Sequence, residues 1–334
     1  MSEQHALLAD TADKVFAALS GDFAADWRAV ADAGLAAVMV PEAQGGFGGG
    51  FEDAHMILHA AGRHATALPM AEAILAARLL AESGVATAGA LTLTKDTDGS
   101  LENGGFTGTL SGVACGEDCA HVIAIVAGHV VSLACRDAEV IERHSDPADT
   151  PYLTLRFAKA PAAAAPTAWT AHRLFHAMAL ARASQIGGAI TAALELAATH
   201  VNQREQFGRP LAKFQAIQQQ MAVLAEEDAA ATAAARAAAC AADCTADGGE
   251  ADFPIACAKL RANRAAGEAA SIAHQVHGAI GFTREYDLQR FTRRLWAWRS
   301  EYGNERHWAN LLGGQVARQG ADGFWPGLVA NFAG

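Results

Sequence analysis

The hydrophobic pattern of the chain changes twice along its length, and this order of patterns limits the available folds more than any other feature. As far as about Gly84, apolar residues recur at helical spacing, as in Trp27, Val30 and Leu35. Short β-type runs separated by Gly and Asp follow, at 91–94, 121–126, 130–133 and 152–157.

A Pro- and Ala-rich loop at 161–166 ends the β-type region, and the pattern then stays helical nearly to the end. Breaks are expected in this last part at 248–249 and 278–281, where glycines cluster. The patterns therefore predict three domains. These are a helical domain at 1–87, a middle β domain at 88–163 that forms a small antiparallel barrel or sandwich, and a C-terminal helical domain at 164–334.

Composition and charge narrow the class of protein. The chain has 334 residues, of which 51% are hydrophobic and 18% charged, so it is long enough for two or three cores and too apolar for a disordered chain. Its net charge of −11 argues against a nucleic-acid partner, because binding to phosphate backbones depends on clusters of Lys and Arg. No apolar run reaches the roughly twenty residues of a membrane span, and the N-terminus lacks the features of a secretory signal. We therefore expect a cytoplasmic protein with no membrane partner.

Six cysteines fit a reducing compartment. Cys115 and Cys119 are four apart, as are Cys240 and Cys244, and the second pair lies in an Ala-rich run where Cys behaves as a small apolar residue. Zinc sites favour tighter Cys pairs or His partners at ligand spacing. No metal site is expected.

Two sequence blocks carry groups suited to a phosphate-containing cofactor. The first is Arg204-Glu205-Gln206-Phe207-Gly208-Arg209-Pro210-Leu211 with Phe214-Gln215, and the second is Gln275-Val276-His277-Gly278-Ala279-Ile280-Gly281-Phe282-Thr283. A guanidinium meets phosphate with a rigid fork of donors, and a glycine lets backbone N–H groups approach closely. The alternative is that Arg204 is a solvated cation at a helix end and that Gly278 only stops a helix.

Together the two blocks resemble the acyl-CoA dehydrogenase family. The resemblance implies a mostly α fold with a small β domain, in the order N-terminal helical domain, middle antiparallel β domain and C-terminal four-helix bundle. It also implies FAD as cofactor: in the family the Arg meets the pyrophosphate, the Phe packs beside the adenine, and the Gln and Gly of the second block reach the dinucleotide from a neighbouring subunit. The cofactor-binding residues that it implies are Arg204, Gln206, Phe207, Leu211, Phe214, Gln215, Gln275, Gly278 and Asn304.

The family oxidises an acyl-CoA thioester to the 2,3-enoyl-CoA, and its base is usually a Glu in a Tyr-Glu-Gly-Thr segment. An ungapped alignment places that Glu at Tyr302, so the sequence departs from the pattern. Glu301 stands one position earlier and is the candidate catalytic base, while Glu305 is a weaker candidate. The alternative is that Glu301 is a solvated carboxylate at a helix end.

Some relatives carry the Glu on the first long helix of the C-terminal domain, but that position is Met178 here. Arg182, about one turn further on, either faces a ligand or pairs with an acidic residue. Trp296, Trp298 and Trp308 add bulk near Glu301, although aromatic residues at helical spacing are more often part of a core.

A second departure concerns the middle domain, which is short and lacks the Thr-Glu-Pro-x-x-Gly-Ser-Asp segment of the family. The chain thus resembles divergent, shortened bacterial members from steroid and related lipid degradation, which often work as heteromers of two unlike subunits. The partners implied are an acyl-CoA substrate, an electron-transfer flavoprotein, and either further copies of the chain or an unlike subunit in a heterotetramer. Two functions remain open: a catalytic subunit, and a non-catalytic partner that completes the FAD site of a heteromeric enzyme.

Overall fold

The computed structural model describes residues 3–244 and 251–332. The chain divides into two compact units, Met1–Ile57 with Thr66–Met178 and Leu58–Ala65 with Ala179–Gly334. The expected fold class, helical with a middle sheet domain, is confirmed. The three domain ranges stay a prediction, and the break expected at 248–249 lies outside the described residues. Among the described residues, no helix is both long and apolar enough to cross a membrane.

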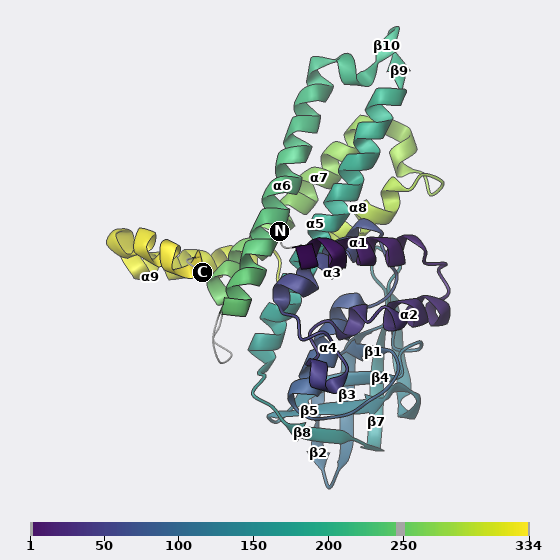
Figure 1. The fold of residues 1–334 in the computed structure, drawn as a ribbon, viewed down its shortest axis with the longest axis vertical. Coiled ribbons are helices and arrows are strands. Elements are labelled where there is room, and N and C mark those ends of the chain that lie inside the picture. The colour runs from purple at the N-terminus through teal and green to yellow at the C-terminus, as the bar shows by residue number, and fades with distance from the viewer. Residues whose placement is uncertain (1–2, 245–250, 333–334) are drawn as a thin grey trace. The chain divides into compact units, whose positions relative to one another are not determined.

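The helices of the first unit come early in the chain (Figure 1). They are α1 (Glu3–Ala17), α2 (Phe23–Asp32), α3 (Phe51–Arg63), whose last residues belong to the second unit, and α4 (Met70–Glu82), with short 3₁₀ turns at Leu35–Ala37 and Glu42–Gln44. Asp22 caps α2, because its side chain accepts a hydrogen bond from the Ala25 backbone N–H at 2.8 Å. The helix α4 is buried nearly all round, which explains why it is apolar on every face.

Two four-stranded sheets form the β region of this unit, in the orders β1-β4-β5-β8 and β2-β3-β7-β6. The strands are β1 (Leu91–Leu93), β2 (Asp96–Glu102), β3 (Gly105–Ala114), β4 (His121–Val126), β5 (His129–Ala134), β6 (Glu139–Ser145), β7 (Pro151–Pro161) and β8 (Ala163–Pro166). All pairs are antiparallel except β1 with β4. One core contains residues of both sheets, including Phe106, Val122, Leu133 and Phe157.

The four β-type runs predicted from the sequence correspond to β1, β4, β5 and β7. Among the other strands, β2 and β6 carry no such pattern because they are exposed along nearly their whole length. The expected loop at 161–166 is wrong in part, since β8 lies there and pairs with β5. Its short run of alanines gives no alternation, and pairing with a neighbouring strand decides its conformation instead.

The second unit contains the long helices of the C-terminal part (Figure 1). They are α5 (Ala171–Gln203), whose first residues belong to the first unit, α6 (Gln215–Cys244), α7 (Asp252–His277), α8 (Leu288–Ser300) and α9 (Glu305–Phe332). Between α5 and α6 lie β9 (Glu205–Gln206), β10 (Arg209–Pro210) and a 3₁₀ turn at Leu211–Lys213, and a second 3₁₀ turn at Gly278–Phe282 follows α7. Small residues bring the helices close together: Ala265, Ala266, Ala269 and Ala270 of α7 are fully buried.

Candidate functional site

A tight hairpin at the end of α5 holds the centre of the first block. Residues Gln206 and Arg209 pair across it, which leaves Phe207 and Gly208 as a two-residue turn with φ of 50° and 75°. Positive φ at both positions is the type I′ geometry that suits a two-residue hairpin, but it is rare for a bulky side chain. Phe207 is nonetheless 90% exposed. The hairpin therefore holds an apolar ring in solvent in a strained conformation, which is typical of a binding element.

Neighbouring residues brace this hairpin. The Phe214 ring lies edge to face with Phe207 at 6.2 Å between centroids, and the Arg209 guanidinium lies 4.1 Å from the Phe214 ring centroid. The Leu211 N–H donates to the Arg204 carbonyl at 2.9 Å and closes the loop. The side chains of Arg204, Gln206 and Gln215 are exposed, and those of Leu211 and Phe214 are half-buried.

The second block lies at the C-terminal end of α7. Gly278 ends the helix with φ of 64° and ψ of −144°, and a Cβ there would meet no atom within 4 Å. The backbone conformation, not lack of space, therefore requires glycine. Gln275 and Gly278 are both exposed.

A stack of aromatic rings brings the two blocks to the same end of the helices. The His200 and His277 rings stack with centroids 4.5 Å apart, and His200 lies one turn before Arg204 in α5. His277 Nδ1 donates to the Ala273 carbonyl at 2.7 Å, and its Nε2 lies 3.2 Å from the Tyr286 hydroxyl. Burial lowers the pKa of both His200 and His277, and the charge of His277 lowers that of His200 further. A lowered pKa favours the neutral form of each ring, and neutral rings stack without charge repulsion.

The groups gathered here fit a dinucleotide such as FAD. An exposed guanidinium, exposed carboxamides and a glycine backbone match a pyrophosphate, and an exposed aromatic ring matches an adenine. Asn304 is different, since its Oδ1 accepts from the His307 N–H at 3.0 Å and so caps α9. Its expected contact with the cofactor, like those of the other residues, stays a prediction.

Glu301, the candidate base, is half of a buried ion pair. It follows the last residue of α8, and its Oε2 accepts from Arg182 Nε at 2.7 Å, with side-chain exposures of 4% for Arg182 and 10% for Glu301. Arg182 Nη1 donates to Gln185 Oε1 at 2.6 Å. Arg182 thus has the acidic partner that was one of its two expected roles, and Glu301 is not a solvated carboxylate. The role of Glu301 as base stays a prediction. The weaker candidate, Glu305, forms an ion pair with Arg299.

A buried lysine that the sequence analysis missed lies beneath the end of α8. Lys259 of α7 is fully buried, and its Nζ donates to the Trp298 carbonyl at 2.9 Å and to Asn263 Oδ1 at 2.6 Å. Burial lowers the pKa of Lys259 to about 7, although the charges of Glu301 and Glu305 oppose the shift. The signal that could have revealed it is a single Lys on the face of α7 otherwise occupied by apolar residues such as Ile255 and Ala262.

Two further groups bind the short connection between α8 and α9. Asn263 Nδ2 donates to the Gly303 carbonyl at 3.0 Å, and Trp308 Nε1 lies 3.1 Å from the carbonyl oxygens of both Tyr302 and Gly303. Tyr302 and Gly303 have φ of 51° and 94°. The connection that bears Glu301 is therefore held in a strained conformation by hydrogen bonds to its carbonyls. Trp308 is fully buried and thus belongs to the core, as aromatic residues at helical spacing usually do.

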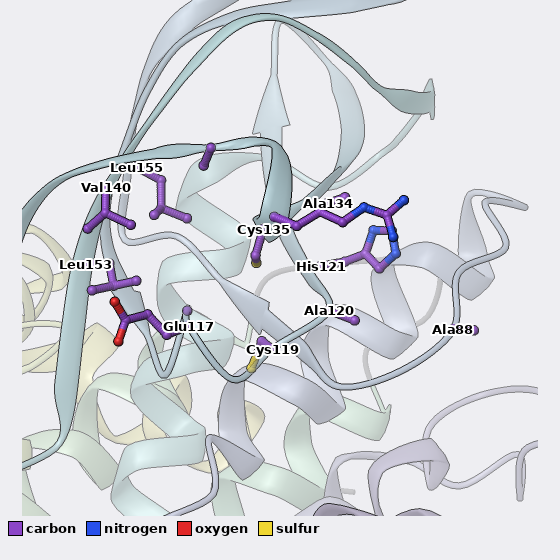
Figure 2. A pocket seen from close by; sticks show the side chains of 13 residues that line it. Ala88, Glu117, Cys119, Ala120, His121, Ala134, Cys135, Val140, Leu153 and Leu155 are labelled. Atoms are coloured by element: carbon purple, nitrogen blue, oxygen red, sulfur yellow. The ribbon is translucent and has the colours of Figure 1, made fainter. Parts of the chain in front are cut away.

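A separate pocket of about 510 Å³ lies in the sheet region of the first unit (Figure 2). Figure 2 shows Glu117 and His121 on opposite sides of it, with Cys119 and Cys135 between them. Burial raises the pKa of the Cys135 thiol to about 12 and that of Cys119 still further from its usual value. Because a thiol reacts as its thiolate, these cysteines line the pocket as apolar groups.

Comparisons with known proteins agree with this geometry. Residues 169–310 match the family model described as acyl-CoA dehydrogenase, C-terminal domain. The chain is 27% identical over 317 residues to acyl-CoA dehydrogenase IpdE2 of Mycolicibacterium smegmatis, covering 88% of this chain and 93% of the relative.

Two solved structures share the fold over nearly the whole chain. The ChsE4-ChsE5 complex from Mycobacterium tuberculosis has a TM-score of 0.83 at 20% identity, covering 96% of this chain and 99% of that chain. A variant of the Tcur3481-Tcur3483 steroid ACAD has a TM-score of 0.82 at 24% identity, covering 95% of this chain and 98% of that chain.

Proposed function

Because the chain belongs to the acyl-CoA dehydrogenase family, we propose that it is a subunit of an FAD-dependent enzyme that oxidises an acyl-CoA thioester to the 2,3-enoyl-CoA. The observation that carries the proposal is the hairpin after α5, which holds the Phe207 ring 90% exposed at a positive φ near the exposed Arg204. The substrate class is the acyl-CoA of lipid degradation, including steroid-derived acyl-CoAs. The likeness to a steroid ACAD supports this choice.

When bound, FAD would supply the hydride acceptor of the reaction, and the proposed electron-accepting partner is an electron-transfer flavoprotein. The proposed task of Arg204 is to neutralise the pyrophosphate, and that of Phe207 is to cover the adenine. Gln275 and Gly278 are exposed, and their proposed task is to reach the dinucleotide from a neighbouring subunit. Because ligand pockets usually bury most of a ligand's surface, these exposed groups bind FAD well only when another subunit covers it.

This assignment is tested by the visible absorption spectrum of the protein, purified alone and together with an unlike subunit. We expect little flavin on the isolated chain and a full flavin band in the complex. Arg204→Gln should lower flavin occupancy of the complex, whereas Arg264→Gln, at an exposed position on α7, should not. Full flavin occupancy of the isolated monomer would contradict the shared site.

For the chemical step, we propose that Glu301 takes the proton from the carbon next to the thioester carbonyl. Its position suits a base because the carboxylate is almost fully buried and its backbone is fixed. The second candidate function, a non-catalytic partner subunit, is favoured by the ion pair with Arg182. Separating two buried charges is costly, so the pair opposes release of the carboxylate for proton transfer.

The variant Glu301→Gln distinguishes the two functions, because it keeps the shape of the side chain and removes its basicity. Loss of a general base costs on the order of 10²–10⁴ in rate, so turnover of an acyl-CoA panel by the holoenzyme should fall by this factor. Glu226→Gln, at an exposed position on α6, is the matched control. Turnover that survives in Glu301→Gln assigns the chain to the non-catalytic role.

A further inference from the structure

Lys259 is fully buried in α7, and both of its hydrogen bonds go to neutral oxygen atoms. An apolar side chain of similar length would fill the same space without removing an amine from water. Packing therefore does not explain a lysine at this position. The explanation lies in the two oxygen atoms to which it donates.

One of these oxygens is the Trp298 carbonyl, in the last turn of α8. Carbonyls of a last turn lack partners within the helix, so a donor from outside the helix satisfies one of them. Lys259 thus caps α8 from a neighbouring helix, just before the chain leaves α8 at Glu301.

The other oxygen belongs to Asn263, one turn further along α7. Because Lys259 fixes Asn263 Oδ1, the amide nitrogen of Asn263 points to the Gly303 carbonyl, to which it donates at 3.0 Å. Lys259 therefore acts on the chain on both sides of Glu301. Before Glu301 it bonds the Trp298 carbonyl itself, and after Glu301 it acts on the Gly303 carbonyl through Asn263.

We propose that Lys259 is a positioning residue that fixes the backbone of the connection bearing Glu301. The charged groups around its amine come from each helix packed there: Glu301 after α8, Arg182 from α5 and Glu305 from α9. The inference rests on the proposed function, because it concerns the geometry of the same carboxylate. Displacement of a reacting group by about 1 Å can cost 10²-fold in rate, so a residue that touches no substrate can still control turnover.

The test compares Lys259→Met and Lys259→Arg with Arg264→Met, an exposed neighbour on α7, in the purified holoenzyme. We expect Lys259→Met to lower kcat by about tenfold or more and to change KM by less than about threefold, because alignment is lost and binding is not. Lys259→Arg keeps N–H donors at this position, and we expect it to restore most of kcat. Arg264→Met should match the wild type.

Hydrogen exchange of the peptide covering 297–308 gives a readout that does not depend on activity. Loss of the two hydrogen bonds from Lys259 Nζ should speed exchange by about tenfold in Lys259→Met, whereas exchange should be unchanged in Arg264→Met. If Lys259→Met does not fold, Asn263→Ser is judged by the same two readouts, because it removes both the amide donor to Gly303 and the amide oxygen that Lys259 fixes.

The outcomes separate this inference from the proposed function. A fall in kcat with faster exchange of 297–308, both reversed by arginine, supports positioning. Unchanged kcat and exchange in Lys259→Met overturn it, as does a fall in kcat that arginine does not relieve. If the wild type shows no turnover, the proposed catalysis fails and the positioning of the connection is decided by exchange alone.

Discussion

The depressed pKa of Lys259 makes a prediction about stability that needs no knowledge of the substrate. Burial lowers this pKa from 10.5 to about 7, so between these values the folded chain holds a neutral amine and the unfolded chain an ammonium. The unfolded state then binds more protons, and the free energy of unfolding rises with pH. We expect Lys259→Met to remove that rise.

The magnitude follows from the size of the shift. One proton bound only by the unfolded state changes the free energy of unfolding by about 1.4 kcal/mol per pH unit. The interval from pH 8 to pH 9.5 lies between the two pKa values of Lys259. Across it, the wild type should gain about 2 kcal/mol relative to Lys259→Met.

Urea unfolding at pH 8 and pH 9.5, at one fixed protein concentration, measures this difference. Other titrating groups are common to both proteins and cancel when one is subtracted from the other. Lys14→Met is the control, because the Lys14 side chain is 74% exposed, and its pH dependence should follow the wild type. If Lys259→Met gains as much stability as the wild type over this interval, the amine is not neutral in the folded protein and the reasoning is wrong.

Three further predictions concern other parts of the chain. Trp169→Phe removes the 2.5 Å hydrogen bond that the Trp169 indole donates to Glu82. Burial alone would raise the pKa of Glu82, but the hydrogen bonds from Arg78 and Trp169 outweigh the effect of burial and lower this pKa. The variant should lose about 1 kcal/mol at pH 7 in urea unfolding and less near pH 4, because a depressed carboxyl pKa stabilises the fold above the unfolded pKa and this contribution is lost as pH falls. Gly303→Ala places a Cβ 2.5 Å from Trp308 Nε1 at a φ of 94°, so thermal unfolding should show that the free energy of unfolding falls by about 1–3 kcal/mol. Gly104→Ala is the control, because Gly104 also has a positive φ but has open space around it, and this variant should lose less stability. Phe207→Ala should change the free energy of unfolding of the isolated chain by less than about 0.5 kcal/mol, because the ring is exposed. The same variant should weaken FAD binding to the complex in a flavin fluorescence titration. Unchanged flavin affinity would argue against a contact between Phe207 and the adenine.

The sequence predicted the order of helical and β regions because buried elements repeat apolar residues at their own period. The strands β4, β5 and β7 illustrate this, since each is buried along most of its length. Strands β2 and β6 lie at the edges of their sheet with exposed side chains, so only their pairing with β3 and β7 defines them. Such pairing is a long-range contact that no local pattern records.

The two parts of the candidate site differ in the same way. The two blocks proposed to bind the cofactor stand out in the sequence because each is contiguous and because the proposed chemistry depends on exposed groups and on glycines that end elements, such as Gly278. The surroundings of Glu301 come from four helices, with Arg182 on α5, Lys259 on α7 and Trp308 on α9. Each of these residues looks ordinary on its own helix, and only their meeting gives them a role. The structure thus changes the question about Glu301 from whether a carboxylate is present to whether its ion pair with Arg182 opens. The free energy needed to separate that buried pair decides between a catalytic subunit and a non-catalytic partner.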